Sequence, residues 1–252
     1  MAEKTVKVAL LGAGTVGSQT ARLLVEQADE LARRAGARIE LTGVAVLDPN
    51  EVNDPWIDKS LLTTETLDLT TRADIVVELI GGIEPARTFV LSALNHGASV
   101  VTANKALLAQ HGPELYEAAE KNGVDIYFEA AVGGAIPIVR PLRESMVGDR
   151  INRIMGIVNG TTNYILDEMT TKGLAFDTVL KDAQAKGFAE ADPTADIGGF
   201  DGAAQAAPMG GFAVPPAVCL GQFNIMGSGH HHATADFVAH PALQRLNNTL
   251  HC

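Results

Sequence analysis

Three glycines near the N-terminus have the spacing that dinucleotide-binding loops use. Gly12, Gly14 and Gly17 follow an apolar run at residues 6–11 and precede a helical pattern. In such a loop the first glycine permits a tight turn, the second leaves room for a pyrophosphate, and the third lets the helix pack closely on the strand. The helix N-terminus then faces the anion. A glycine-rich turn without a ligand is the alternative, and the strand–loop–helix context favours dinucleotide binding.

Two charged residues could act beside this loop. Asp48 follows the second expected strand, where a carboxylate can accept a hydrogen bond from an adenosine ribose and favour NAD by repelling the 2′-phosphate of NADP. The Asp48-Pro49 pair equally suits a turn. Lys105 follows another expected strand, at residues 99–102. It could hold an anion or share a substrate proton, or it could be an exposed lysine beyond a strand, and the residues alone favour neither interpretation.

Four carboxylates lie close together further along the chain. They are Glu190, Asp192, Asp196 and Asp201. They could grip a substrate ammonium, polarise a hydroxyl or bind a cation. A solvated acidic loop with an Asp-Pro turn is the ordinary alternative for such a segment. The residue types alone favour the solvated loop.

Composition excludes several classes of protein. The 252 residues are 46% hydrophobic, enough for a packed core, and their net charge of −11 disfavours nucleic acid and anionic membranes as partners. No signal peptide and no run of ~18 apolar residues is present, so we expect a cytoplasmic protein. No cysteine precedes Cys219, which argues against an aldehyde dehydrogenase that forms a thiohemiacetal.

The glycine loop and Lys105 fall within a regular alternation of strands and helices. We expect strands at residues 6–11, 38–46, 73–80, 99–102 and 125–128, and helices at residues 15–35, 85–95 and 106–121. Helices of this length force parallel pairing through crossovers, because parallel strands cannot be joined by a tight turn. The sequence therefore predicts an α/β fold, a doubly wound parallel Rossmann-type sheet, over residues 1–130.

The pattern changes beyond this domain. A glycine-rich joint at residues 132–135 leads to an expected helix up to residue 146 and a strand at 151–158, and further helices are expected from residue 159 and at 176–186. We expect residues 131–207 to form a partial α+β substrate and dimerisation domain. Residues 208–252 lack periodicity and predict an irregular tail.

Six motifs together resemble homoserine dehydrogenase. They begin at Gly12 (GAGTVG), Glu78 (ELIGG), Thr102 (TANK), Glu129 (EAAVGG), Asn159 (NGTTNY) and Gly187 (GFAEADP). They follow that family's order and spacing over residues 4–201. The resemblance implies NAD- or NADP-linked interconversion of L-homoserine and L-aspartate 4-semialdehyde, a step in threonine, methionine and isoleucine biosynthesis.

The resemblance also assigns roles to residues at matching positions. Thr15 and Val16 would line the dinucleotide, Lys105 would lie between cofactor and substrate, and Gly187 would touch the nicotinamide side. Glu190 and Asp201 would bind homoserine, with Asp196 close by. The implied monovalent cation is sodium, with the Glu129 carboxylate and the carbonyl oxygens of Val132, Gly134 and Ile136 as its ligands. The family's homodimer is implied too.

The chain departs from the family pattern at one chemically important position. The family has a proton-transferring lysine four residues after the aspartate matched by Asp201, and this chain has Gln205 there. A glutamine side chain cannot exchange a proton near neutral pH, and acid–base groups typically contribute ~10²–10⁴-fold to a rate. Together with the unmatched tail, this predicts a second candidate, a truncated and catalytically impaired dinucleotide-binding fragment.

Overall fold

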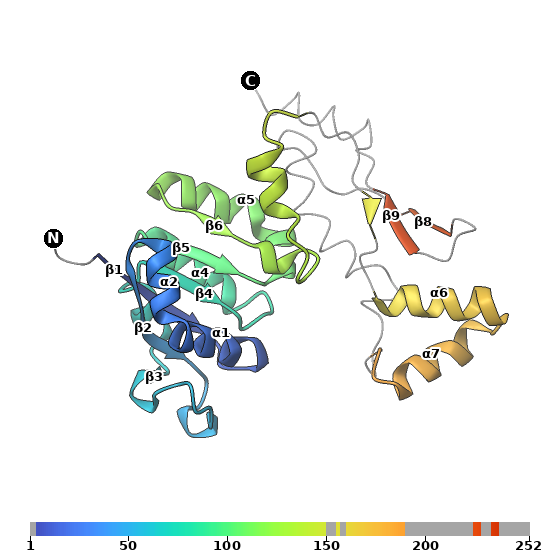
Figure 1. The fold of residues 1–252 in the computed structure, drawn as a ribbon, viewed down its shortest axis with the longest axis horizontal. Helices are drawn as coiled ribbons and strands as arrows, with labels where there is room; N and C mark the ends of the chain where they lie inside the picture. Colours follow the sequence, from blue (N-terminus) through green and yellow to red (C-terminus); the bar gives the residue numbers. More distant parts are fainter. Residues whose placement is uncertain (1–3, 150–154, 157–159, 190–223, 228–232, 237–252) are drawn as a thin grey trace. The chain divides into compact units, whose positions relative to one another are not determined.

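The computed structural model describes residues 4–149, 155–156, 160–189, 224–227 and 233–236. The chain divides into two compact units, Met1–Ala131 and Val132–Cys252. Figure 1 shows the elements of each unit, and each unit is described by itself.

A six-stranded sheet forms the centre of the first unit. Its strands are β1 (Thr5–Leu11), β2 (Arg38–Ala45), β3 (Leu62–Thr63), β4 (Ile75–Glu78), β5 (Ser99–Thr102) and β6 (Ile126–Tyr127). They lie in the order β3-β2-β1-β4-β5-β6, and every neighbouring pair is parallel. This confirms the predicted doubly wound fold. The strand order reverses between β1 and β4, which is where such sheets bind ligands beyond their carboxyl ends.

Helices connect these strands. They are α1 (Thr15–Glu26), α2 (Ala28–Ala35), α3 (Thr66–Thr70), α4 (Ala86–Asn95) and α5 (Lys105–Asn122), with 3₁₀ turns η1 (Pro49–Glu51), η2 (Lys59–Leu61) and η3 (Glu129–Ala131). The expectation of one helix over residues 15–35 is wrong, because Gln27 leaves helical geometry at φ −107° and ψ 18°. Gly17 and Ala21 of α1 are buried, whereas no residue of α2 is, so the break separates two helices that differ in burial.

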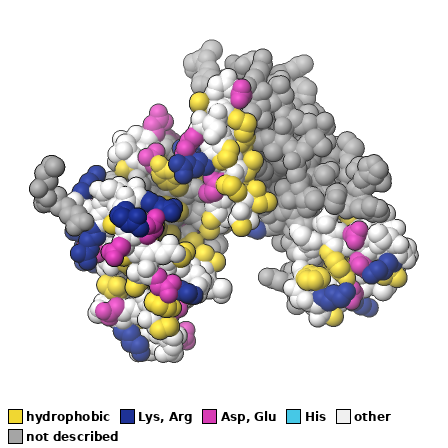
Figure 2. Space-filling model, in the orientation of Figure 1, with side chains coloured by type: hydrophobic (Ala, Val, Ile, Leu, Met, Phe, Trp, Pro, Cys, Tyr) yellow, Lys and Arg dark blue, Asp and Glu magenta, His cyan; other side chains and the backbone are white. Residues whose placement is uncertain are grey.

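The core follows from the apolar strand runs. Leu10, Val44, Val76 and Val100 have no solvent exposure, which is expected when both faces of a parallel sheet are covered by helices. Residues of α4 and α5 cover part of this sheet, among them the fully buried Leu94. Figure 2 shows that acidic and basic side chains are interspersed on the visible face of this unit.

The second unit contains a helix pair and a small sheet. Its elements are the π-helix η4 (Pro141–Ser145), α6 (Gly160–Lys172), α7 (Phe176–Ala185), and strands β7 (Met155–Gly156), β8 (Asn224–Gly227) and β9 (Ala233–Asp236). Helices α6 and α7 pack through Ile165, Val179 and Ala183, all buried. The sheet has the antiparallel order β7-β9-β8.

Two expectations for this unit need correction. The helix expected up to residue 146 begins late. Positive φ angles at Gly133 (59°) and Ala135 (65°) make residues 132–135 a bend and a turn, and the proline at 137 disfavours helical geometry in the residue before it. The tail expected to be irregular contains β8 and β9, which pair with each other. β9 also pairs with the distant β7, and local hydrophobic patterning does not reveal such a non-local pairing. Most of the strand expected at residues 151–158 lies outside the described residues.

Candidate functional site

The glycine loop has the geometry that its sequence predicts. Gly12 has φ +98°, a conformation that side chains disfavour. A Cβ atom on Gly17 would lie 2.1 Å from the carbonyl oxygen of Gly12, so α1 approaches the loop closer than any side chain permits. A Cβ atom on Gly14 would meet nothing within 4 Å. The loop is therefore closed on its helix side and open at Gly14.

The N-terminus of α1 can receive an anion. Gly14 is the N-cap and supplies no side-chain hydrogen bond, and the first helical residues, Thr15 and Val16, are exposed. The first amides of a helix carry unsatisfied N–H groups and the positive end of the helix dipole. A pyrophosphate placed over Gly14 would accept hydrogen bonds from these amides.

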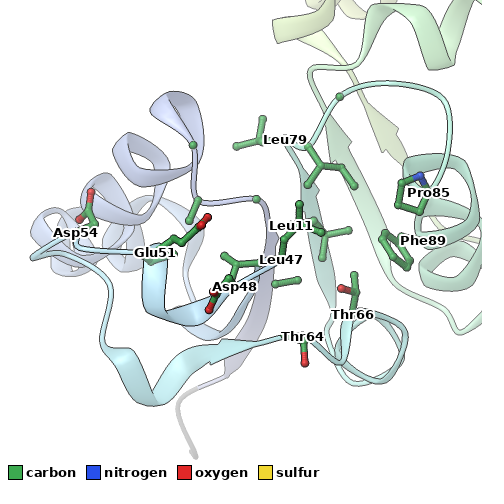
Figure 3. Close-up of a pocket in the computed structure, with 18 of the residues that line it drawn as sticks. Leu11, Leu47, Asp48, Glu51, Asp54, Thr64, Thr66, Leu79, Pro85 and Phe89 are labelled. Carbon is green, nitrogen blue, oxygen red and sulfur yellow. The ribbon is translucent and has the colours of Figure 1, made fainter.

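A cavity of about 870 Å³ opens beside the loop. Gly12 and Gly14 line it, and Figure 3 shows Asp48 and Glu51 on one wall and Phe89 on the opposite wall. The remaining lining residues are Leu11, Ala13, Ala45, Val46, Leu47, Val52, Asn53, Asp54, Thr64, Thr66, Leu79, Ile80, Gly81 and Pro85. Its volume and its mixture of apolar walls with a few carboxylates and hydroxyls are typical of a cofactor site.

Asp48 lies in a turn and also lines the cavity. Its Oδ1 accepts hydrogen bonds from the backbone N of Asn50 at 2.8 Å and from Asn50 Nδ2 at 2.9 Å, so it caps the turn η1. It also lines the cavity, as do Glu51 and Asp54. Three carboxylates therefore give this wall a negative charge, which favours ribose hydroxyls over an additional phosphate.

A buried polar cluster lies at the carboxyl ends of β4 and β5. Glu78 and Thr102 are fully buried and Asn104 nearly so, at 6% exposure. Thr102 Oγ1 donates to Glu78 Oε2 at 2.5 Å, and Thr102 Oγ1 accepts from the backbone N of Asn104 at 2.9 Å. The sequence pattern predicts no role for these three residues. The signal that could have revealed Glu78 and Thr102 is a carboxylate and a hydroxyl, each at the end of an apolar strand.

Lys105 begins α5 directly after this cluster. Asn104 caps the helix, because its Oδ1 accepts from the backbone N of Leu107 at 3.0 Å. Lys105 is half-buried and does not line the cavity described above. The structure thus gathers Gly12, Gly14 and Asp48 around one cavity, whereas Lys105 stands at the end of the neighbouring strand β5.

The predicted substrate residues belong to the second unit. Gly187 follows α7 with φ +75°. The others, Glu190, Asp196, Asp201 and Gln205, lie outside the described residues. Their roles remain predictions.

A polar cluster on α6 and α7 leads into the Gly187 segment. Lys186 Nζ donates to Asp182 Oδ2 and to the Tyr164 hydroxyl, both at 2.8 Å. Tyr164 also donates to Asp182, and its ring meets Phe188 edge to face at a centroid distance of 5.1 Å. The Lys186 and Tyr164 hydrogen bonds lower the pKa of Asp182, while the bonds to Asp182 and Tyr164 raise the pKa of Lys186. Thr161 Oγ1 donates to the Phe188 carbonyl at 2.7 Å, so both helices hold this segment.

The four predicted sodium ligands occupy consecutive short elements. Glu129 begins η3 at the end of the first unit. Val132 is buried, while Gly134 and Ile136 lie exposed in the turns that open the second unit. Among the described residues no three His, Cys, Asp or Glu side chains gather to hold a metal. Three of the four predicted sodium ligands are backbone carbonyls, so the sodium site stays a prediction.

The strand order and the glycine loop define the first unit as a dinucleotide-binding α/β domain. Two family models match the chain, "Homoserine dehydrogenase, NAD binding domain" at residues 12–129 and "Homoserine dehydrogenase" at residues 137–228. Together they span most of it, and the chain belongs to the homoserine dehydrogenase family. The second match continues past residue 201, where the motif resemblance ends.

Known relatives agree with this assignment. Homoserine dehydrogenase of Corynebacterium glutamicum is 53% identical over 210 residues, 82% of this chain and 47% of that protein. A crystal structure of a homoserine dehydrogenase from Thiobacillus denitrificans has a TM-score of 0.77 and 47% identity, over 84% of this chain and 49% of that one. A hyperthermophilic archaeal homoserine dehydrogenase in complex with NADPH has a TM-score of 0.71 and 28% identity, over 83% of this chain and 70% of that one.

The chain spans about half the length of the known relatives it matches, 47% of the Corynebacterium protein. Within the described residues, no helix has both the length and the apolar character to cross a membrane.

Proposed function

We propose that this protein interconverts L-homoserine and L-aspartate 4-semialdehyde with NAD or NADP, as part of threonine, methionine and isoleucine biosynthesis in the cytoplasm. The observation that carries the proposal is the glycine loop, whose closed contact at Gly17 and open face at Gly14 leave room for a pyrophosphate beside the cavity. The family assignment supplies the substrate.

The residues of the first unit fit a dinucleotide. Gly12, Gly14 and the first turn of α1, with Thr15 and Val16, would hold the pyrophosphate, and Gly17 would keep the helix close to the strand. Asp48 would accept a hydrogen bond from the adenosine ribose, and the acidic wall supports a preference for NAD over NADP. When bound, the nicotinamide supplies a hydride acceptor, and the protein's task is to orient the substrate carbon against it.

Substrate handling would fall to residues of both units. Lys105 would lie between cofactor and substrate, where its ammonium group can hold the substrate oxygen and share its proton. Glu190, Asp196 and Asp201 would bind homoserine, and Gly187 would touch the nicotinamide side. Motif position alone supports these four roles, and the Lys186 and Tyr164 contacts support an ordered approach to Gly187.

Two further features of the family complete the proposal. Sodium would bind to the Glu129 carboxylate and the carbonyl oxygens of Val132, Gly134 and Ile136, which are hard oxygen donors suited to a hard cation. The protein would form a homodimer. Both rest on the family alone.

A second candidate function is dinucleotide binding without efficient turnover. Gln205 favours it, because a glutamine stands where the family places its proton-transferring lysine. Lys105 would then have to act alone or through water.

One assay separates the two candidates. Formation of NADH with homoserine at alkaline pH is followed by absorbance for the wild type and for Gln205→Lys, and dinucleotide binding is measured by calorimetry. Restoring the lysine should raise turnover by ~10²–10⁴-fold if the missing acid–base group limits the rate. Dinucleotide binding with no NADH formation by either protein would leave the second candidate, and failure to bind NAD and NADP would reject both.

A further inference from the structure

A carboxylate is sealed inside the protein at the end of β4. The Glu78 side chain has no solvent exposure. A buried charge is costly unless hydrogen bonds compensate for its lost hydration. Three donors do so here: the backbone N atoms of Ile80 and Gly81 reach Oε1 at 3.0 Å each, and Thr102 Oγ1 reaches Oε2 at 2.5 Å.

One pair of these bonds shapes a wall of the cavity. Ile80 and Gly81 both line the cavity, and they follow Glu78 directly along the chain. A Cβ atom on Gly12 would lie 3.0 Å from Ile80 Cγ2, so this segment lies against the glycine loop. Gly81 and Gly82 have φ angles of +73° and +71°, a backbone course that bends the segment back onto the Glu78 carboxylate.

The other bond leads to the helix that carries Lys105. Thr102 Oγ1 accepts from the backbone N of Asn104 at 2.9 Å, and Asn104 caps α5. Asn104 Nδ2 also donates to the carbonyl of Gly82 at 2.6 Å. The hydrogen bonds therefore form a closed circuit from Glu78 through Thr102 and Asn104 to Gly82, the residue that follows Gly81 of the cavity wall.

We propose that Glu78 is a positioning residue, whose buried carboxylate joins the cavity wall at Ile80 and Gly81 to the N-terminus of α5, so that dinucleotide binding and the placement of Lys105 depend on one another. The inference rests on the proposed function, because it takes the ligand of the cavity to be a dinucleotide.

Strand pairing alone does not call for a charge at this position. Glu78 and Thr102 are already cross-strand partners in the parallel ladder, and an apolar pair of similar volume would fill the same space without desolvating a charge. The carboxylate instead accepts the backbone N–H groups of a bend that an apolar side chain would leave unsatisfied. Departures from an apolar core of this kind are expected at functional sites.

The position of Glu78 and Thr102 in the sheet predicts which half of the dinucleotide should lose affinity when their hydrogen bond is removed. In a doubly wound sheet the two halves of the dinucleotide lie on opposite sides of the reversal between β1 and β4. Asp48 follows β2, on the adenosine side, whereas Glu78 and Thr102 end β4 and β5 on the nicotinamide side. Loss of the circuit should weaken NADH binding and spare AMP, which lacks the nicotinamide half.

Calorimetric titration with NADH and AMP tests this for Glu78→Gln, Thr102→Val and Thr102→Ser. Thr102→Val keeps the shape and removes the hydroxyl, whereas Thr102→Ser keeps the hydroxyl. We expect Glu78→Gln and Thr102→Val to weaken NADH about tenfold, the effect of losing one hydrogen bond to a charged group, with AMP affinity changed less than about twofold. Thr102→Ser should retain wild-type affinity for both.

Thr70→Val is the matched control. Thr70 is equally buried, and its Oγ1 bonds to the Leu67 carbonyl at 2.8 Å and to Ser92 Oγ at 2.9 Å, but it does not line the cavity. This variant should lose stability as Thr102→Val does and keep the wild-type ratio of NADH to AMP affinity. An unchanged ratio in Thr102→Val and Glu78→Gln would overturn the positioning role while leaving the proposed function intact.

Hydrogen exchange of the ligand-free protein tests the coupling directly. In Thr102→Val the amides of Ile80, Gly81 and Leu107 should all exchange faster than in the wild type, and in Thr70→Val none of them should. Faster exchange on only one side of the circuit would overturn the coupling. If the wild type fails to bind NADH, the proposed function and the ligand part of this inference both fail, and the exchange rates still decide whether the two segments are joined.

Discussion

Gly17 packs so closely on Gly12 that a Cβ atom on Gly17 would lie 2.1 Å from the Gly12 carbonyl oxygen. Since that neighbour is backbone, the overlap cannot be relieved by a side-chain rotation. We expect Gly17→Ala to force α1 away from β1 and to lower the free energy of unfolding by about 1–3 kcal/mol, the range for overpacking. Urea denaturation measures this, and Gly148→Ala, at a glycine with open space around its Cβ position, serves as the control. Equal stability of the two variants would contradict the packing role.

Gly14→Ala should weaken dinucleotide binding and leave stability unchanged, in contrast to Gly17→Ala. Gly14 has an ordinary φ of −70° and nothing within 4 Å of its Cβ position, so the folded protein should accept the methyl group with little change in stability. The methyl group would project into the space proposed for the pyrophosphate. We expect NAD affinity to fall at least tenfold, or about 1.4 kcal/mol, with the melting temperature unchanged. Undiminished NAD binding would place the pyrophosphate elsewhere.

The architecture of the first unit could be predicted because its signals are local. Apolar runs such as that around Val76 mark buried parallel strands, and the helices between them fix the pairing. The break at Gln27 could not be predicted, because the apolar spacing continues across it while only α1 has fully buried residues. The pairing of β9 with β7 joins segments far apart in sequence, which periodicity does not reveal.

In the candidate site, too, features within one short segment could be predicted from the sequence, and features that depend on distant segments could not. The glycine loop was visible from spacing alone, because one short segment supplies all of its geometry. The sequence around Asp48 suits either a ribose contact or a turn, and the structure places Asp48 both in a turn and in the cavity wall. The roles of Glu78 and Thr102 emerge only when β4 and β5 lie side by side, since 24 residues separate the partners of their hydrogen bond.

Asp48→Asn should relax the choice between NAD and NADP. An asparagine can still accept from the backbone N of Asn50 and keep the turn, so stability should not change. The loss of one negative charge near the 2′ position should improve the ratio of NADP to NAD affinity about fivefold, equivalent to ~1 kcal/mol for unit charges at 4 Å in water. Calorimetric titration with both dinucleotides measures the ratio. Glu40→Gln, which removes a charge from an exposed position on β2, should leave it unchanged.

Lys105 and Lys121 provide a matched pair on one helix. Both belong to α5, but Lys105 begins it beside the carboxyl end of β5 whereas Lys121 lies in its last turn. We expect Lys105→Met to lower homoserine-dependent NADH formation by ~10²–10⁴-fold, as for loss of an acid–base group, and Lys121→Met to have no effect. The rates are compared in the wild type and in the Gln205→Lys background. Similar rates for the two variants would show that Lys105 has no role in the reaction.

The contact of Asp182 with Lys186 should make the stability of the second unit depend on pH at both extremes. Hydrogen bonds from Lys186 and Tyr164 hold the pKa of Asp182 below its ordinary value of 3.8, so this contribution is present above pH 3.8 and is lost as the pH falls through the lowered pKa. The bonds to Asp182 and Tyr164 raise the pKa of Lys186 above 10.5, so its contribution is complete below pH 10.5 and is lost as the pH rises through the raised pKa.

Melting curves of the wild type, Asp182→Asn and Lys186→Met therefore check one prediction. The wild type should melt at a higher temperature than either variant near neutral pH, and its advantage over Asp182→Asn should vanish in strong acid. Both side chains are more than a third exposed, so the advantage should be small and should shrink in high salt. Lys181→Met, on the same helix, is the control. An advantage that persists unchanged well below pH 3.8 would mean that packing of Tyr164 against Phe188, and not the charge on Asp182, holds this end of the helix pair together.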